Sequence, residues 1–188
     1  MGKFDPLRYV EKAGVLALMS EFAWRGYNVA IPEIDVGDDL YVTNDRTGMI
    51  SRIQVKTATG KRQIQSMRYQ FAVSKSSIED EVTMPEIHFV FTIRDSVDAW
   101  RYVFIRRAEL NMYVQRDGIG TAQQRNDRIS ETLVFSFTLH DDNRFTAGQG
   151  SRLDLTRHLD NWTSWPVLLQ PATRRKADRN KAEQQVQE

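Results

Sequence analysis

Two short stretches decide the fold of this chain: IDVGDDLYV at residues 34–42 and RIQVKT at residues 52–57. The first stretch ends in residues that favour β structure, and a turn-rich run follows it at residues 44–48. An extended run then resumes at residues 49–55. The two stretches therefore predict a β-hairpin.

The alternation of side chains along a strand gives this hairpin two different faces. Gln54 and Lys56 are two residues apart, so their side chains emerge on one face, whereas Ile53 and Val55 emerge on the other. Asp39, at the mouth of the first strand, can meet Gln54 across the ladder, with Lys56 one step away. The hairpin thus predicts a carboxylate, an amide and an ammonium group in one place, a set that can hold a divalent metal beside a phosphate.

Charge is divided into two blocks around the same hairpin. Every charged residue from position 33 to 45 is acidic, and every charged residue from position 46 to 78 is basic. An acidic cluster repels phosphate unless it holds a cation, whereas a basic block attracts a polyanion. A metal ion and a nucleic acid satisfy both blocks; in the alternative interpretation the acids are turn residues and the bases form a solvated face. The candidate nucleic-acid-binding residues are Arg52, Lys61, Arg62, Arg68 and Lys75.

The order and spacing of these residues resemble the PD-(D/E)XK nuclease superfamily, which includes many restriction enzymes and Holliday-junction resolvases. The similarity is to the branch in which Gln replaces the acidic residue of the E-x-K motif, as in intron-encoded homing endonucleases and a group of uncharacterised bacterial domains. It runs from about Ala13 to Lys56. The resemblance implies an α/β fold with a restriction-endonuclease-like mixed β-sheet flanked by helices.

The resemblance also implies roles for individual residues. Asp39 matches the metal-binding aspartate, Gln54 the substituted ligand and Lys56 the motif lysine, so these three are the candidate catalytic residues. The implied cofactor is Mg²⁺ or Mn²⁺, held by Asp39 and Gln54 with Asp35 and Glu21 as further candidate ligands. The ion and Lys56 would activate a water for in-line attack on a phosphodiester. Because Gln54 offers a neutral oxygen, metal affinity is expected to be weaker than with a carboxylate.

One departure from the family pattern leaves alternatives open. Many members carry a glutamate just after the glycine that corresponds to Gly14, and this chain has Val15 there. The expected function is a metal-dependent DNA endonuclease of a defence, mobile-element or repair system. The alternative is a catalytically silent nuclease-fold module that binds nucleic acid or a protein partner. A phosphodiesterase acting on RNA or a small molecule is a third interpretation.

Composition is compatible with these interpretations. The chain has 188 residues, 40% of them hydrophobic, and a formal net charge of +1. We expect one nuclease-like domain at residues 1–170 and a polar, flexible tail at residues 171–188. Cysteine is absent, which excludes disulfides and thiolate metal sites, and no segment has the length and apolar character of a membrane span. We therefore expect a cytoplasmic protein that binds DNA and forms a homo-oligomer, because cutting both strands of a duplex suits two-fold symmetry.

Periodicity and turn residues predict the remaining elements. A helix is expected from Asp5-Pro6 to Gly26 and a strand at residues 27–31. Further strands are expected at residues 67–74, 87–93, 100–105 and 132–139, all in one mixed sheet. A short helix is expected at residues 108–115, an exposed loop at residues 118–127, and a closing helix at residues 153–159 that carries Trp162 and Trp165 against the core.

Overall fold

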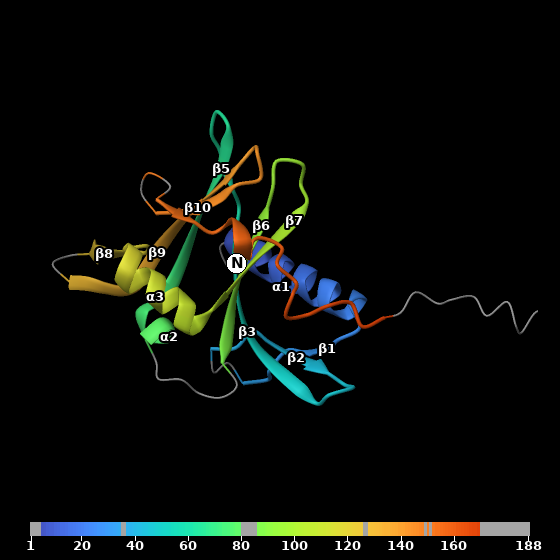
Figure 1. Cartoon of the computed structure of the whole chain (residues 1–188). Helices are drawn as coiled ribbons and strands as arrows, with labels where there is room; N and C mark the ends of the chain where they lie inside the picture. The colour runs from blue at the N-terminus through green and yellow to red at the C-terminus, as the bar shows by residue number, and fades with distance from the viewer. Residues whose placement is uncertain are drawn as a thin grey trace, which may run out of the picture.

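The protein is described by a computed structural model (Figure 1), which covers residues 5–34, 37–79, 86–125, 128–148, 150 and 152–169. At residues 123–125 and 128–130 the description is limited to the backbone. The elements in chain order are α1 (Pro6–Trp24), β1 (Asn28–Ala30), β2 (Leu40–Asn44), β3 (Met49–Ala58), β4 (Lys61–Arg62), β5 (Ser66–Ser74), α2 (Lys75–Glu79), β6 (Ile87–Arg94), β7 (Trp100–Arg106), α3 (Arg107–Asp117), β8 (Thr121–Arg125), β9 (Arg128–His140), β10 (Phe145–Ala147), β11 (Leu153–Asp154) and a 3₁₀ turn (Thr156–His158).

Helix α1 begins and ends where its sequence predicts. The carboxylate of Asp5 accepts a hydrogen bond from the backbone N–H of Leu7, and proline occupies the first turn. Gly26 ends the helix with a φ of +94°, a conformation that glycine adopts at little cost. The buried residues Gly14, Leu18 and Phe22 form the stripe that faces the sheet.

The first sheet is mixed and has the strand order β1-β2-β3-β6-β7. Strands β3 and β6 are parallel, and the other neighbours are antiparallel. The predicted hairpin is present, with Leu40 opposite Ile53 and Asn44 opposite Met49. The predicted α/β class with a mixed sheet is therefore confirmed.

The expectation of a single sheet is wrong, because the strands at residues 67–74 and 132–139 belong to a second sheet. Its order is β11-β10-β9-β5-β4, with β8 paired to β9, and all of its pairs are antiparallel. The physical reason is burial. Strand β6 is apolar and buried along almost its whole length, so both of its faces need a cover. Strand β5 buries every second residue and so supplies one of these covers.

The molecule consequently has three layers with two apolar cores (Figure 1). Leu18 and Phe22 of α1 pack on one face of the first sheet, together with Ile53 and Val55 of β3. The second sheet packs on the opposite face, where β5 and β9 meet the alternate residues of β6 and β7. Helices α2 and α3 contribute Ile78, Leu110 and Tyr113 to this second core.

Two further expectations are corrected by hydrogen bonding. Part of the predicted loop at residues 118–127 is strand β8, because its backbone completes the ladder of β9. The predicted closing helix is instead β11 followed by a 3₁₀ turn, whose Thr156 N–H is bonded by the Asp154 carboxylate. Trp165 is nonetheless buried against Phe22, as the aromatic content of this segment predicts.

The predicted tail at residues 171–188 lies outside the described residues, and the division into one domain and a tail stays a prediction. Over the part of the chain that the structure describes, no helix combines the length and apolarity that a membrane crossing requires.

Candidate active site

Asp39 is fixed to strand β3 by both its backbone and its side chain. Its backbone N–H donates to the carbonyl of Ile53 at 2.9 Å, and its Oδ2 accepts from the backbone N–H of Val55 at 2.7 Å. These two bonds bracket Gln54. The carboxylate of Asp39 is thereby held beside Gln54 at the mouth of the hairpin, as the sequence predicts.

Gln54 and Lys56 share one face of β3, and this prediction is confirmed. Ile53 and Val55 belong to the core under α1, whereas Gln54 is in register with Phe89 of the opposite core. Gln54 is 8% exposed and Lys56 is half-buried. Within the described residues neither side chain forms a hydrogen bond or an ion pair with the protein. Packing thus holds the Gln54 amide and the Lys56 ammonium group in place, and their polar atoms can still form hydrogen bonds with a ligand.

Asp38, one residue earlier, has a different environment. It is 3% exposed, and its Oδ2 accepts from Nε of Arg52 at 2.8 Å. A hydrogen bond with Asp38 raises the pKa of Tyr41. Asp38 therefore joins the start of β2 to β3 by a largely buried ion pair, and nucleic-acid binding by Arg52 stays a prediction for a guanidinium that already has this partner.

The structure does not bring Glu21 to the other candidate ligands. Its carboxylate accepts from Nε of Arg25 at 3.0 Å, and the Arg25 guanidinium lies 4.0 Å from the ring centroid of Trp162. Burial, with the added charges of Glu21 and Asp160, raises the pKa of Tyr102 on β7 to about 12. Glu21 thus pairs with Arg25 near the C-terminal end of α1, and its role as a metal ligand stays a prediction. Asp35 lies outside the described residues.

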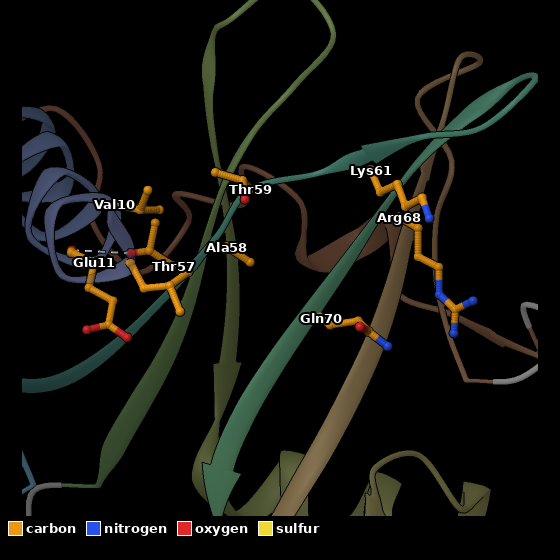
Figure 2. A pocket seen from close by; sticks show the side chains of 9 residues that line it. Val10, Glu11, Thr57, Ala58, Thr59, Lys61, Arg68 and Gln70 are labelled. Carbon is orange, nitrogen blue, oxygen red and sulfur yellow. Dashed lines mark hydrogen bonds between the residues drawn. The ribbon is translucent and has the colours of Figure 1, made fainter. Parts of the chain in front are cut away.

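Glu11 is a candidate residue that the sequence interpretation missed. It is exposed and precedes the buried Gly14 by three residues, about one turn closer to the N-terminus of α1. Its backbone carbonyl lies 3.5 Å from Oγ1 of Thr57, the residue after Lys56. Figure 2 shows Glu11 on one side of the end of β3, opposite the basic residues of β4 and β5. A carboxylate one helical turn before Gly14, which contacts β3, is the signal that could have identified it.

Glu11 lies in a cavity of about 330 Å³ between α1, the end of β3 and the β4–β5 pair (Figure 2). The cavity is lined by Leu7, Val10, Glu11, Thr57, Ala58, Thr59, Lys61, Arg68 and Gln70. Three of these residues directly follow Lys56 along the chain. The cavity therefore continues from the candidate catalytic strand to the second sheet.

The predicted nucleic-acid-binding residues differ in their partners. Arg62 makes two bonds to Asp141, at 2.8 and 2.9 Å, and Lys75 lies 3.6 Å from Glu79. Lys61 and Arg68 face each other in the β4–β5 register, and neither has an ion-pair partner among the described residues. Lys61 and Arg68 are consequently the members of this group whose charge is best placed to meet an external phosphate.

The donor set is compatible with a hydrated Mg²⁺ or Mn²⁺ ion. No group of three or more His, Cys, Asp or Glu side chains within the described ranges could hold a metal. Mg²⁺, however, commonly keeps several waters and uses one or two carboxylates together with substrate phosphates. The Asp39 carboxylate and the neighbouring Gln54 amide oxygen match that mode of binding.

Comparisons with known proteins give a distant likeness. Among solved structures, "a bacterial homing endonuclease: I-Ssp6803I" matches with a TM-score of 0.38 and 14% identity, over 53% of this chain and 68% of that one. No protein-family profile and no curated protein matches the chain.

Proposed function

We propose that the protein is a metal-dependent endonuclease that hydrolyses phosphodiester bonds in DNA. The observation that carries the proposal is the side-by-side placement of Asp39, Gln54 and Lys56 on the β2–β3 hairpin. A catalyst of phosphodiester hydrolysis needs a site for a cation and a positioned positive group near the same phosphate. Such an activity fits each of the settings expected from the sequence, namely defence, a mobile element or repair.

Each residue then has a defined task. Asp39 and the Gln54 carbonyl oxygen would hold the ion, and the bond from the Val55 N–H keeps the Asp39 carboxylate oriented. When bound, a divalent ion supplies stabilisation of the charge that develops on the phosphate and acidifies a coordinated water. Lys56, without an internal carboxylate partner among the described residues, donates hydrogen bonds to a phosphate oxygen or to the attacking water.

We assign Glu11 to the same site as a positioning residue. It approaches the end of β3 from α1, and its cavity begins at the residues that follow Lys56. Its carboxylate would accept a hydrogen bond from a water held in the cavity that it lines. Glu11→Gln should lower the cleavage rate about tenfold while leaving Mn²⁺ affinity almost unchanged, because the change affects orientation and not the anchor. A large loss of metal affinity in this variant would instead make Glu11 a ligand.

Plasmid cleavage tests the main proposal. Purified protein is incubated with supercoiled plasmid and Mg²⁺ or Mn²⁺, beside Asp39→Ala, Lys56→Ala and the exposed control Lys12→Ala on α1. We expect nicking by the wild type and by Lys12→Ala, and a loss of about 10²-fold or more in the two site variants. Absence of nicking by the wild type across salt and substrates would contradict the proposal, as would equal nicking by the site variants.

A second candidate, the silent binding module, is favoured by one observation. The described residues bring one carboxylate, Asp39, next to Gln54 on the hairpin, while Asp38 is already paired with Arg52. Calorimetry separates the two functions. Binding of Mn²⁺ that is lost in Asp39→Ala supports the endonuclease, whereas DNA binding without Mn²⁺ binding supports the silent module.

Self-association belongs to the proposal as a prediction. A single site of this kind serves one strand, so cutting a duplex on both strands needs two copies or two binding events. Light scattering on the free protein and on its DNA complex gives the stoichiometry. Double-strand breaks made by a strict monomer would contradict this prediction.

A further inference from the structure

The β4–β5 hairpin carries an exposed aliphatic side chain at its tip. Lys61 pairs with Arg68 and Arg62 pairs with Met67, and the turn is closed by a bond from the Gln63 N–H to the Ser66 carbonyl at 2.8 Å. Ile64, at the tip, is 95% exposed. In Figure 1 the hairpin projects from the upper end of the molecule. The Ile64 side chain contributes nothing to the core and is open to contact by a partner.

The tip is held rigidly. The Ser66 hydroxyl donates to Oε1 of Gln63 at 3.1 Å, and the Gln65 carbonyl accepts from the Asp141 backbone N–H at 3.1 Å. Arg62 reaches the same Asp141 with two bonds, which fastens the hairpin to the β9–β10 turn. Ile64 is thus presented in a fixed position, and little conformational entropy is lost when a partner covers it.

Charge around the hairpin indicates what that partner is. No acidic residue occurs from position 46 to 78, and Lys61 and Arg68 at the base of the hairpin have no ion-pair partner among the described residues. Arg68 is oriented by a bond from its Nη2 to Oγ of Ser136 at 3.2 Å. The neighbouring β6–β7 tip exposes Val97 to 78% but carries Asp95 and Asp98 beside it. Asp141 offsets the charge of Arg62 at the tip, so the attraction of the β4–β5 hairpin for a polyanion comes from Lys61 and Arg68.

We propose that the β4–β5 hairpin enters the major groove of duplex DNA, with Ile64 against thymine methyl groups and Lys61 and Arg68 on the flanking phosphates. A two-stranded ribbon fits this groove, and apolar side chains there contact the thymine methyl. Gln65, exposed beside Ile64, offers the amide pair that recognises adenine. The inference rests on the proposed function, because the cavity joins Lys61 and Arg68 to the residues that follow Lys56.

Duplex binding measured apart from cleavage tests this inference. A fluorescein-labelled alternating dA·dT duplex is titrated by anisotropy in Ca²⁺ buffer, with Ile64→Ser and the matched tip control Val97→Ser. Ile64→Ser should bind about tenfold more weakly, as loss of one buried aliphatic contact predicts, and Val97→Ser should bind like the wild type. Replacing thymine by uracil, which removes the methyl group, should weaken the wild type but not Ile64→Ser. Lys61→Ala and Arg68→Ala should each make the slope of log K against log salt less negative by about 1.

Several outcomes would overturn the hairpin assignment. These are wild-type affinity of Ile64→Ser, an equal loss in Val97→Ser, indifference of the wild type to uracil, or binding of single-stranded RNA as tight as that of the duplex. The plasmid assay separates this failure from failure of the endonuclease. If the wild type does not nick but loses duplex binding on Ile64→Ser, the hairpin inference stands and the nuclease proposal fails. If the wild type nicks and Ile64→Ser binds and nicks normally, the nuclease proposal stands and the hairpin inference fails.

Discussion

At the scale of single residues, the amide at position 54 sets the expected strength of metal binding. Gln54 is 8% exposed and lies next to Asp39, so a carboxylate in its place adds a charged ligand at the same point. Affinity for divalent ions rises with the number of charged ligands. We predict that Gln54→Glu binds Mn²⁺ about tenfold more tightly than the wild type, measured by calorimetry. Gln115→Glu on the exposed side of α3 is the control, and an equal gain in both variants would contradict a ligand role for position 54.

Asp38 and Asp39 are adjacent in sequence, and we expect Asp38 to contribute to stability and Asp39 to activity. Asp38 is buried and paired with Arg52, whose side chain is 20% exposed, so removal of the carboxylate takes an ion pair from a mostly buried charge. We predict that Asp38→Asn lowers the free energy of unfolding by about 3 kcal/mol in urea denaturation. Asp45→Asn, in the exposed β2–β3 turn, should change it by no more than about 0.5 kcal/mol. Equal effects would show that the pair does not hold the hairpin together.

At the scale of elements, the contact of α1 with β3 fixes the distance between the helix and the end of that strand. A Cβ atom at Gly14 would lie 2.0 Å from Oγ1 and 2.8 Å from Cβ of Thr57, so even alanine forces the two elements apart. This overpacking outweighs the higher helix propensity of alanine, which is worth about 1 kcal/mol.

We predict that Gly14→Ala destabilises the protein by about 2 kcal/mol and lowers cleavage, because Glu11 moves with the helix. Adding Thr57→Ala removes two of the three clashing atoms and should recover part of both losses in a double-mutant cycle. If Gly14→Ala is stabilising, the close approach of α1 to β3 is not required.

At the scale of the whole molecule, the buried His158 and the half-buried His88 make stability depend on pH. Burial lowers the pKa of His88 and of His158 below the ordinary value of 6.5. His158 sits between the Phe104 carbonyl, Tyr113, Glu109 and Arg157, and joins the C-terminal segment to β7 and α3.

A histidine whose pKa is lower in the folded state takes up its proton first in the unfolded state. The stability it contributes is therefore complete above about pH 6.5 and is lost as the pH falls below that value. We predict that the free energy of unfolding, measured in urea, declines between about pH 7 and pH 5.5. The decline should be smaller in His158→Asn and in His88→Gln. A stability that stays level or rises over this interval would contradict the prediction.

Much of the fold follows from local pattern, and the misassigned parts share one cause. Asp5, Gly26 and the alternation of apolar residues predicted α1 and most strands, because caps, turns and strand faces are local properties. The division into two sheets, the strand β8 and the absence of a closing helix depend on which distant backbone groups pair. That pairing is decided between segments far apart in the chain, where a short apolar or polar run fits several partners.

For the candidate site, too, local sequence determines some features and tertiary packing determines the others. The sequence by itself determined that Gln54 and Lys56 share a face and that Asp39 lies across the ladder from them, because strand periodicity and hairpin register fix these relations within about twenty residues. Tertiary structure alone decided that Arg52 and Arg62 are paired with carboxylates, and that Glu11 lies beside the end of β3. A side chain's partner is set by packing between elements. The residues of one element do not by themselves specify which surface of another element packs against them.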